Sequence, residues 1–333
     1  MRRSASPLSL VILGLGVFLL VLAPMLAWYV EPRAKRTPID IDTTTVFTGK
    51  GSYFDTGEVE TLENQNLTIT RQVRGDVADS TDEVAAWDVV QSVDPDKSLP
   101  ASSPHDSLQW TQERWVTDRE TNRPVHCCQE SPYFEGEAYL KFPFDVEKRS
   151  YRWWDSTLGA TVPLDYAGKR KVQGYEGLLF TAEVEPVKTG TRQVPGALLK
   201  SKASQVIAEE WYANHGIELV VDQRTGRIIY AQVGPRKTLR MPGSDEDAVV
   251  LLDSKKIAFT EKTQKAQVAL AEDDSSRLQL VGQTLPIGTG ALGFVLTVVG
   301  VLLVLRGRER PDPGTPDGPG ATTPAPAPVS APV

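Results

Sequence analysis

The sequence predicts an α+β protein in which a β-rich antiparallel domain lies between an N-terminal and a C-terminal transmembrane helix. Two observations lead to this fold class. Each end of the chain carries an uncharged apolar run, 23 residues long at 8–30 and 21 residues long at 285–305, and the segment between them is rich in strand patterns. A helix rises about 1.5 Å per residue, so about 20 apolar residues cross the roughly 30 Å hydrocarbon core of a bilayer.

The first apolar run, residues 8–30, follows the short basic start of residues 1–7. The alternative is a cleaved signal peptide. The apolar part of a signal peptide is usually about 7–15 residues long, shorter than this run, and the small residues of a cleavage site are poorly placed here. We expect a retained helix with a cytoplasmic start. Trp28 and Tyr29 would then lie at the outer interface, where aromatic rings prefer to sit.

The second apolar run, residues 285–305, is followed at once by three arginines: Arg306, Arg308 and Arg310. The positive-inside bias therefore places the C-terminus in the cytoplasm. Two spans then require a cytoplasmic N-terminus as well, so we expect residues 31–284 on the outer side of a plasma membrane. The tail, residues 306–333, is rich in Pro, Gly and Ala and predicts a disordered cytoplasmic segment.

The predicted outer domain, residues 31–284, is acidic. Of the 36 Lys and Arg residues of the chain five lie outside this segment, and of the 43 Asp and Glu residues three do, which leaves it with a net charge of −9. Nucleic-acid binding requires a basic surface, so we expect no nucleic-acid partner. The predicted partners are the lipid bilayer, through the two spans, and possible other membrane proteins.

Strand patterns fill the outer domain. Residues 43–54 and 66–73 combine β-branched residues with alternation, and residues 173–184 resemble them. Residues 217–233 form two β-rich runs around a turn with Gly226 at its left-handed position, which predicts a hairpin. Residues 260–283 have helical spacing and could run into the second span. Charges occur throughout the candidate strands, so we do not expect these strands to face lipid.

The densest aromatic cluster of the chain lies at residues 139–154, and basic residues interleave it. The aromatic rings either pack a core or form the wall of an apolar ligand pocket. The basic residues either form a solvated face or bind an anionic head group or phosphate. The candidate pocket residues are Phe142, Phe144, Tyr151, Trp153, Trp154, Lys148 and Arg152.

The stretch RPVHCCQES, residues 123–131, holds the only two cysteines, Cys127 and Cys128. In an oxidising compartment a thiol pair is expected to be oxidised. Adjacent Cα atoms are about 3.8 Å apart, below the usual disulfide range, so a bond between these cysteines closes a strained ring. We expect such a disulfide as a local structural element. Reduced or intermolecular thiols and a redox-active role are the alternatives; a zinc site would need separated ligand pairs.

Enzyme motifs are weak. The chain has no GxSxG, HExxH, phosphate-binding loop or dinucleotide-binding glycine motif. The pairs Asp40, Asp42 and Asp94, Asp96 each lack the rest of a calcium loop. We therefore expect no cofactor, no metal site and no catalytic residues.

The stretch EGEAYLKFPFDVEKRSYRWWDSTLGATVPLDYAGKRKVQGYEGLLF, residues 135–180, resembles the core of an actinobacterial two-pass membrane family of unknown function that is labelled porin PorA. The matching elements are Lys-Phe-Pro-Phe at 141–144, Lys-x-x-Tyr at 148–151, Trp154-Asp155 and a Gly-Tyr turn before a strand. The run VVDQRTGRIIY, residues 220–230, is similar to the Glu-Pro-x-Thr-Gly hairpin of that family, with Asp222-Gln223 in place of Glu-Pro. The resemblance covers nearly the whole chain and implies no catalytic residues. The order of elements is also similar to that of class B scavenger receptors, which implies by analogy a lipid-conducting tunnel.

These observations favour a membrane-anchored cell-surface module that binds or transports an apolar or amphipathic envelope component. Two alternatives remain open: a structural or assembly partner of other envelope proteins, and an enzyme acting on envelope lipids or glycans.

Overall fold

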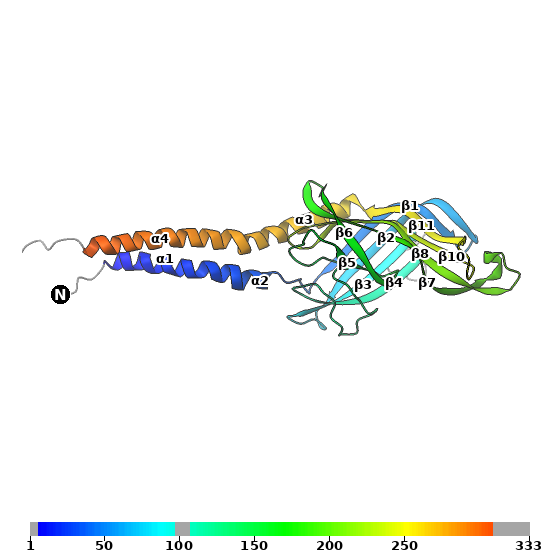
Figure 1. Ribbon diagram of the computed structural model, residues 1–333, viewed down its shortest axis with the longest axis horizontal. Coiled ribbons are helices and arrows are strands. Elements are labelled where there is room, and N and C mark those ends of the chain that lie inside the picture. Colours follow the sequence, from blue (N-terminus) through cyan, green and yellow to red (C-terminus); the bar gives the residue numbers. More distant parts are fainter. Residues whose placement is uncertain (1–5, 97–106, 309–333) are drawn as a thin grey trace, which may run out of the picture. The chain divides into compact units, whose positions relative to one another are not determined.

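The computed structural model describes residues 6–96 and 107–308 of the chain. Most of the predicted N-terminal start, and the predicted tail from residue 309 on, lie outside the described residues. The chain divides into two units. The first contains helices α1 (Pro7–Met25) and α4 (Leu285–Arg308), and the second, the β-rich body, runs from Leu26 to Leu285 (Figure 1).

Helices α1 and α4 approach each other closely at glycines. A Cβ added at Gly16 of α1 would collide with the backbone of Thr297, and one added at Gly293 of α4 would collide with the backbone of Leu20. Small residues permit this kind of close packing between membrane helices. The helical segments Pro7–Ala34 and Glu261–Arg306 are long and apolar enough to cross a membrane.

Both helices continue beyond the predicted spans. After a π-helical turn, Leu26–Val30, the N-terminal helix continues into α2 (Glu31–Ala34). Helix α3 (Glu261–Gln279) is capped by Thr260, whose side chain accepts a hydrogen bond from the Thr263 amide, and it leads through Leu280–Thr284 into α4. The prediction of a helix over 260–283 that runs into the second apolar run is confirmed.

In the described part of the chain, one antiparallel sheet of eleven strands forms the β-rich body (Figure 1). The strand order is β4-β3-β2-β1-β11-β10-β8-β7-β6-β5, and β9 pairs with both β8 and β11. The strands are β1 (Asp42–Asp55), β2 (Glu60–Asp76), β3 (Val84–Pro95), β4 (Gln109–Asp118), β5 (Tyr151–Asp155), β6 (Ala160–Val172), β7 (Tyr175–Pro195), β8 (Gln205–Val221), β9 (Ile228–Val233), β10 (Pro235–Arg240) and β11 (Asp247–Phe259).

The predicted strands and the predicted hairpin are confirmed. The hairpin joins β8 to β9 through a turn in which the Asp222 carboxylate accepts from the Thr225 amide at 2.8 Å. Gly226 has a φ of +73°, the left-handed conformation that glycine adopts without cost. The fold class is thus confirmed as a β-rich antiparallel domain between two apolar helices.

The two edges of the sheet, β4 and β5, are joined by an irregular stretch, residues 119–150, which we call the closing segment. It bridges to β4 at Arg114–Ser131 and Thr117–Pro124, and to β5 at Ala138–Trp153. Tyr139 packs edge-on against Trp115 of β4, with ring centroids 5.5 Å apart. The closing segment therefore fills the gap between the edge strands and encloses the concave face of the sheet.

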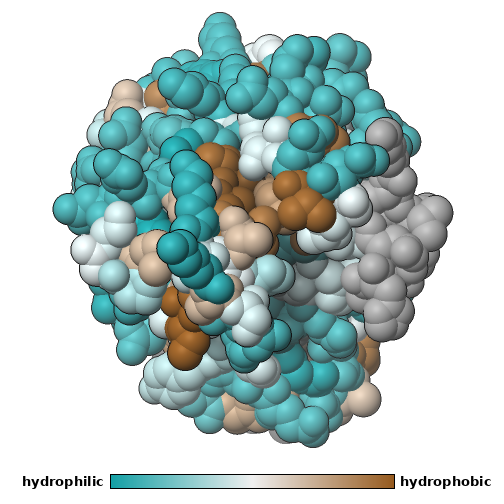
Figure 2. All heavy atoms as spheres, turned by 90° about the vertical axis from the view of Figure 1, so that its right-hand side faces the viewer, coloured by the Kyte–Doolittle hydropathy of each residue, from teal (hydrophilic) through white to brown (hydrophobic). Residues whose placement is uncertain are grey.

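Hydrophobic packing also covers the convex face. Val268 and Ala271 of α3 are buried against Val220 of β8 and Ile229 of β9. At the end of the body that carries the β7–β8 connection, the surface is mostly hydrophilic, with hydrophobic residues gathered around a hollow near its centre (Figure 2). The larger core lies inside the sheet, where the candidate site is found.

Candidate functional site

The concave face of the sheet encloses a cavity of about 550 Å³. Strand alternation explains which residues reach it: Thr43, Thr45 and Phe47 of β1 line the cavity, whereas Thr44 between them is exposed. Residues of both edge strands, β4 and β5, line the same space, so the sheet curves around it. A volume of this size lies within the usual range of small-molecule sites, roughly 300–1,000 Å³.

Much of the cavity wall is apolar and aromatic. Side chains from strands far apart in sequence converge there: Phe47, Ile69, Trp87, Trp115, Leu219 and Phe259. Phe47 and Phe259 contact each other edge to face, with centroids 4.6 Å apart, across the β1–β11 pair. This wall suits an apolar chain or ring, because burial of such a group removes apolar surface from water.

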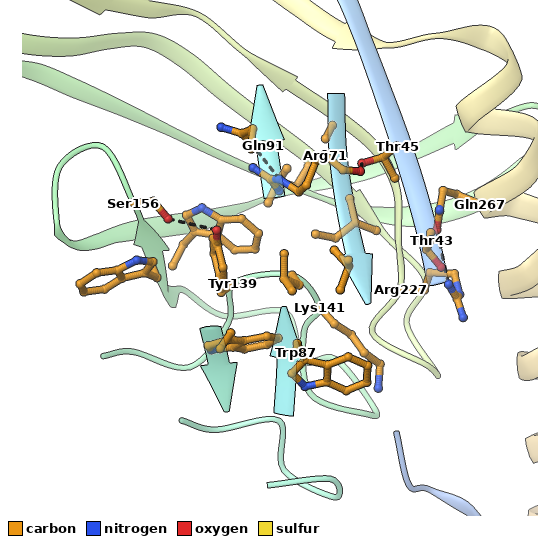
Figure 3. Close-up of a pocket in the computed structure, with 18 of the residues that line it drawn as sticks. Thr43, Thr45, Arg71, Trp87, Gln91, Tyr139, Lys141, Ser156, Arg227 and Gln267 are labelled. Carbon is orange, nitrogen blue, oxygen red and sulfur yellow. Dashed lines mark hydrogen bonds between the residues drawn. The ribbon is translucent and has the colours of Figure 1, made fainter. Parts of the chain in front are cut away.

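Arg71 of β2 places a cation in the middle of this wall (Figure 3). Its Nε donates to Gln91 Oε1 at 2.9 Å, and the guanidinium lies 5.9 Å from the Phe47 ring centroid and 5.8 Å from that of Tyr139. Aromatic faces attract a guanidinium, which helps to compensate its burial.

A hydrogen-bonded group of three side chains lines another part of the cavity. Figure 3 shows two of them, Tyr139 and Ser156. The Tyr139 hydroxyl donates to Glu113, and the Ser156 hydroxyl lies 3.0 Å from Glu113 Oε2 and 3.1 Å from the Tyr139 oxygen. Burial raises the pKa of Tyr139 well above its ordinary value of 10, so the phenol stays protonated. The group can therefore hold polar atoms of a ligand, but it offers no phenolate nucleophile.

Two lysines also line the cavity. Lys141 of the closing segment donates to Thr37 Oγ1 at 3.1 Å, and Lys237 of β10 donates to Gln109 Oε1 at 2.7 Å. Burial lowers the pKa of Lys141 to about 7 and that of Lys237 to about 8, because an ammonium loses hydration inside the protein. Both can change charge near neutral pH.

The structure brings together only part of the predicted pocket. Phe144, Trp153 and Trp154 line the cavity. Phe142 and Tyr151 are buried in the packed core, with ring centroids 5.1 Å apart, and do not line it.

The basic residues among the candidates lie elsewhere. Lys148 is exposed in the closing segment, and Arg152 is exposed on β5 because it alternates with the buried Tyr151 and Trp153. Neither lines the cavity. Strand alternation could have predicted that Arg152 points away from the face of Tyr151 and Trp153. Residues 119–150 have no periodicity, so the sequence offered no comparable prediction for Lys148. Ligand contact by the three lining aromatics stays a prediction.

Several lining residues escaped the sequence-based prediction. Arg71, Glu113, Lys237 and Arg227 are distributed over the β-rich body, far apart in the chain. For the three strand residues the signal was a polar side chain at a position where alternation points inward, as for Arg71 between Ile69 and Val73. Arg227 lies in the β8–β9 turn, where alternation gives no guide.

The adjacent cysteines lie in the closing segment, away from the cavity lining. Their sulfur atoms face each other as in a disulfide, and the Cys128 carbonyl accepts from Arg114 Nε at 2.9 Å. Arg114 also forms ion pairs with Asp76 and Asp88 at 2.8 and 3.1 Å. The cysteine pair thus helps to attach the closing segment to β4. Its oxidation state stays a prediction, which non-reducing peptide mapping of the native protein tests.

A β-rich body with an internal cavity, joined to two helices apolar enough to span a bilayer, is consistent with a membrane protein. Residues 8–302 match the family model described as Porin PorA, which covers most of the chain. The chain belongs to the porin PorA family. No curated protein matches it.

Proposed function

We propose that this protein is a membrane-anchored, extracytoplasmic module that binds or transports an apolar or amphipathic component of the cell envelope. In this proposal both termini are cytoplasmic, residues 31–284 lie outside the plasma membrane, and the role is binding or transport rather than catalysis. Membership of a family described as porin supports a role in transport.

The observation that carries the proposal is the cavity itself. It has about 550 Å³ of space, a wall of apolar and aromatic side chains, and a few polar groups at defined positions. Apolar binding sites usually have this combination, in which the wall supplies affinity and the polar groups fix orientation. The small side chains of Thr45 and Thr111 line the cavity. Substitution of either residue by a larger one should therefore reduce the free space.

The test fills the cavity by substitution. Thr45→Trp introduces a large ring at a position that lines the cavity, and Thr44→Trp introduces the same ring at the exposed neighbour. The pair Thr111→Trp and Gln112→Trp repeats the comparison on β4, where Thr111 lines the cavity and Gln112 is exposed. Lipids that co-purify with the full chain are then measured by mass spectrometry.

We expect wild-type protein and the two exposed variants to carry the same lipid at similar occupancy. The two cavity variants should lose most of it while retaining the circular dichroism of wild-type protein. Equal occupancy in all five proteins would contradict binding in the cavity. Wild-type protein that carries no lipid and instead retains another envelope protein would favour the assembly role.

A further inference from the structure

Lys141 is a cation without a carboxylate beside it. Its ammonium donates to the Thr37 hydroxyl at 3.1 Å and lies 3.5 Å from the centroid of the Phe144 ring. Among the residues that the structure describes, no carboxylate lies within ion-pair distance of this group. An ammonium has three hydrogen-bond donors, so the hydroxyl leaves part of its capacity unused.

A second cation stands at the same end of the cavity. Arg227 Nη2 pairs with Asp274 of α3 at 2.8 Å, and Nη1 reaches Gln267 at 3.4 Å (Figure 3). Its Nε is buried and has no hydrogen-bond partner among the described residues. The charge of Arg227, after burial, contributes to lowering the pKa of Lys141, so the two cations are close enough to repel. Asp274 and Asp222 act on Lys141 in the opposite direction, but neither is within ion-pair distance of it.

The other cavity lysine stands in a similar electrostatic setting, with two carboxylates and one arginine, Arg192, acting on it. Lys237 donates to the Gln109 side chain, and two carboxylates, Asp155 and Glu210, act on it electrostatically and favour its charged form. What distinguishes the Lys141 end is Arg227, whose buried Nε has no hydrogen-bond partner among the described residues. An anion placed there would supply the partner that Lys141 lacks and would also reduce its repulsion with Arg227.

We propose that Lys141, with Arg227 beside it, binds the anionic head group of an amphipathic ligand, a carboxylate or a phosphate, whose apolar chain lies along the aromatic inner wall of the sheet. This inference rests on the proposed function and adds the chemical class of the ligand. Lys141 contacts the head group directly. The Phe144 ring and Thr37 hold its side chain in place, and Phe47 and Ile69 offer the apolar surface for the chain.

The test compares two probes that share the same apolar chain and differ in head-group charge: radiolabelled palmitate and its methyl ester. Binding of each to the full chain in a non-ionic detergent is measured for wild type and for Lys141→Met, Lys141→Arg, Lys237→Met and Lys148→Met. Lys148 is the matched control, because it is an exposed lysine of the same closing segment. Thr45→Trp tests the cavity, and inorganic phosphate tests whether a head group alone suffices.

We expect wild type and Lys148→Met to bind palmitate about 10- to 100-fold more tightly than the ester, as charge-assisted hydrogen bonds of ordinary strength provide. Lys141→Met should lose this preference and bind both probes as wild type binds the ester. Lys141→Arg should recover part of the preference. Thr45→Trp should weaken the binding of both probes to the same extent, since the new ring blocks the space for the apolar chain of the probe and not the site of its head group.

Three results would overturn the inference while leaving the proposed function intact: equal binding of both probes by wild type, an undiminished preference in Lys141→Met, or loss of the preference in Lys237→Met alone. If phosphate binding is lost in Lys141→Met but unchanged in Thr45→Trp, the site binds small anions alone. This result would also overturn the inference. Failure of wild type to bind either probe would reject the inference together with cavity binding of such chains.

Discussion

Lys141 carries an ammonium group that folding moves from water to the wall of the cavity. Its contact with Thr37 joins residues 104 positions apart in the chain. The sequence placed Lys141 in a basic run beside aromatic residues, but the run itself did not separate a buried lysine from exposed ones. Only closure of the sheet distinguishes them, because Lys141 faces inward while Lys148, in the same segment, is exposed.

The lowered pKa of Lys141 predicts a pH-dependent stability. The unfolded chain binds this proton up to about the ordinary value of 10.5, whereas the folded chain releases it near 7. Between these values the unfolded state holds more protons, so the free energy of unfolding rises with pH. The burial penalty is thus fully present below pH 7 and is relieved as the pH rises toward 10.5.

Lys141→Met should remove this penalty. We expect the variant to be more stable than wild type by about 1–3 kcal/mol at pH 6, a value reduced from the full shift because the residue is only partly buried. The difference should shrink by pH 9. Denaturant unfolding at several pH values measures it, with Lys148→Met as the control for loss of a positive charge. A constant difference across this range would contradict the prediction.

The β8–β9 hairpin and the closing segment meet at Gly226. The Phe142 amide donates to the Gly226 carbonyl at 2.9 Å, and a Cβ at Gly226 would collide with the carbonyl oxygens of Phe142 and Pro143. The hairpin itself was predictable from its β-rich runs and its Asp-to-Gly turn. The contact of this hairpin with the irregular closing segment was not predictable, because residues 119–150 show neither helical nor strand periodicity.

Gly226→Ala should therefore be strongly destabilising. We expect a loss of about 2–4 kcal/mol in the free energy of unfolding, from the positive φ together with the backbone collision. Gly174→Ala is the matched control, because Gly174 has a φ of +88° but open space around it. It should cost only about 1 kcal/mol. Equal losses in chemical unfolding of the two variants would show that the contact with the closing segment contributes nothing.

The whole chain combines two apolar helices with one β-rich body. The apolar runs and several of the strands were predictable, since helix length and strand alternation are local properties of the sequence. The order of the strands and the cavity were not, because they depend on pairings between distant segments, such as β1 with β11. Alternation alone shows that a strand has two faces, but only closure shows which one faces the cavity.

The proposed topology is tested at both ends of the chain. Fusion of a reporter that is active only in the cytoplasm after Val333 should give activity, because Arg306, Arg308 and Arg310 follow the second span. The same reporter inserted after Gly243, in the β10–β11 turn, should be inactive. The opposite pattern would place the body in the cytoplasm.

The central claim is that the concave face of the sheet holds an apolar chain, and photocrosslinking tests it most directly. A long-chain carboxylate with a diazirine near the end of its chain is bound to the full chain in membranes and irradiated, and the labelled residues are identified by peptide mass spectrometry. We predict labels on inward-facing residues of the sheet, such as Phe47, Ile69 and Trp87, and their loss in Thr45→Trp but not in Thr44→Trp. Labels confined to α1 and α4, unchanged by either substitution, would contradict the claim.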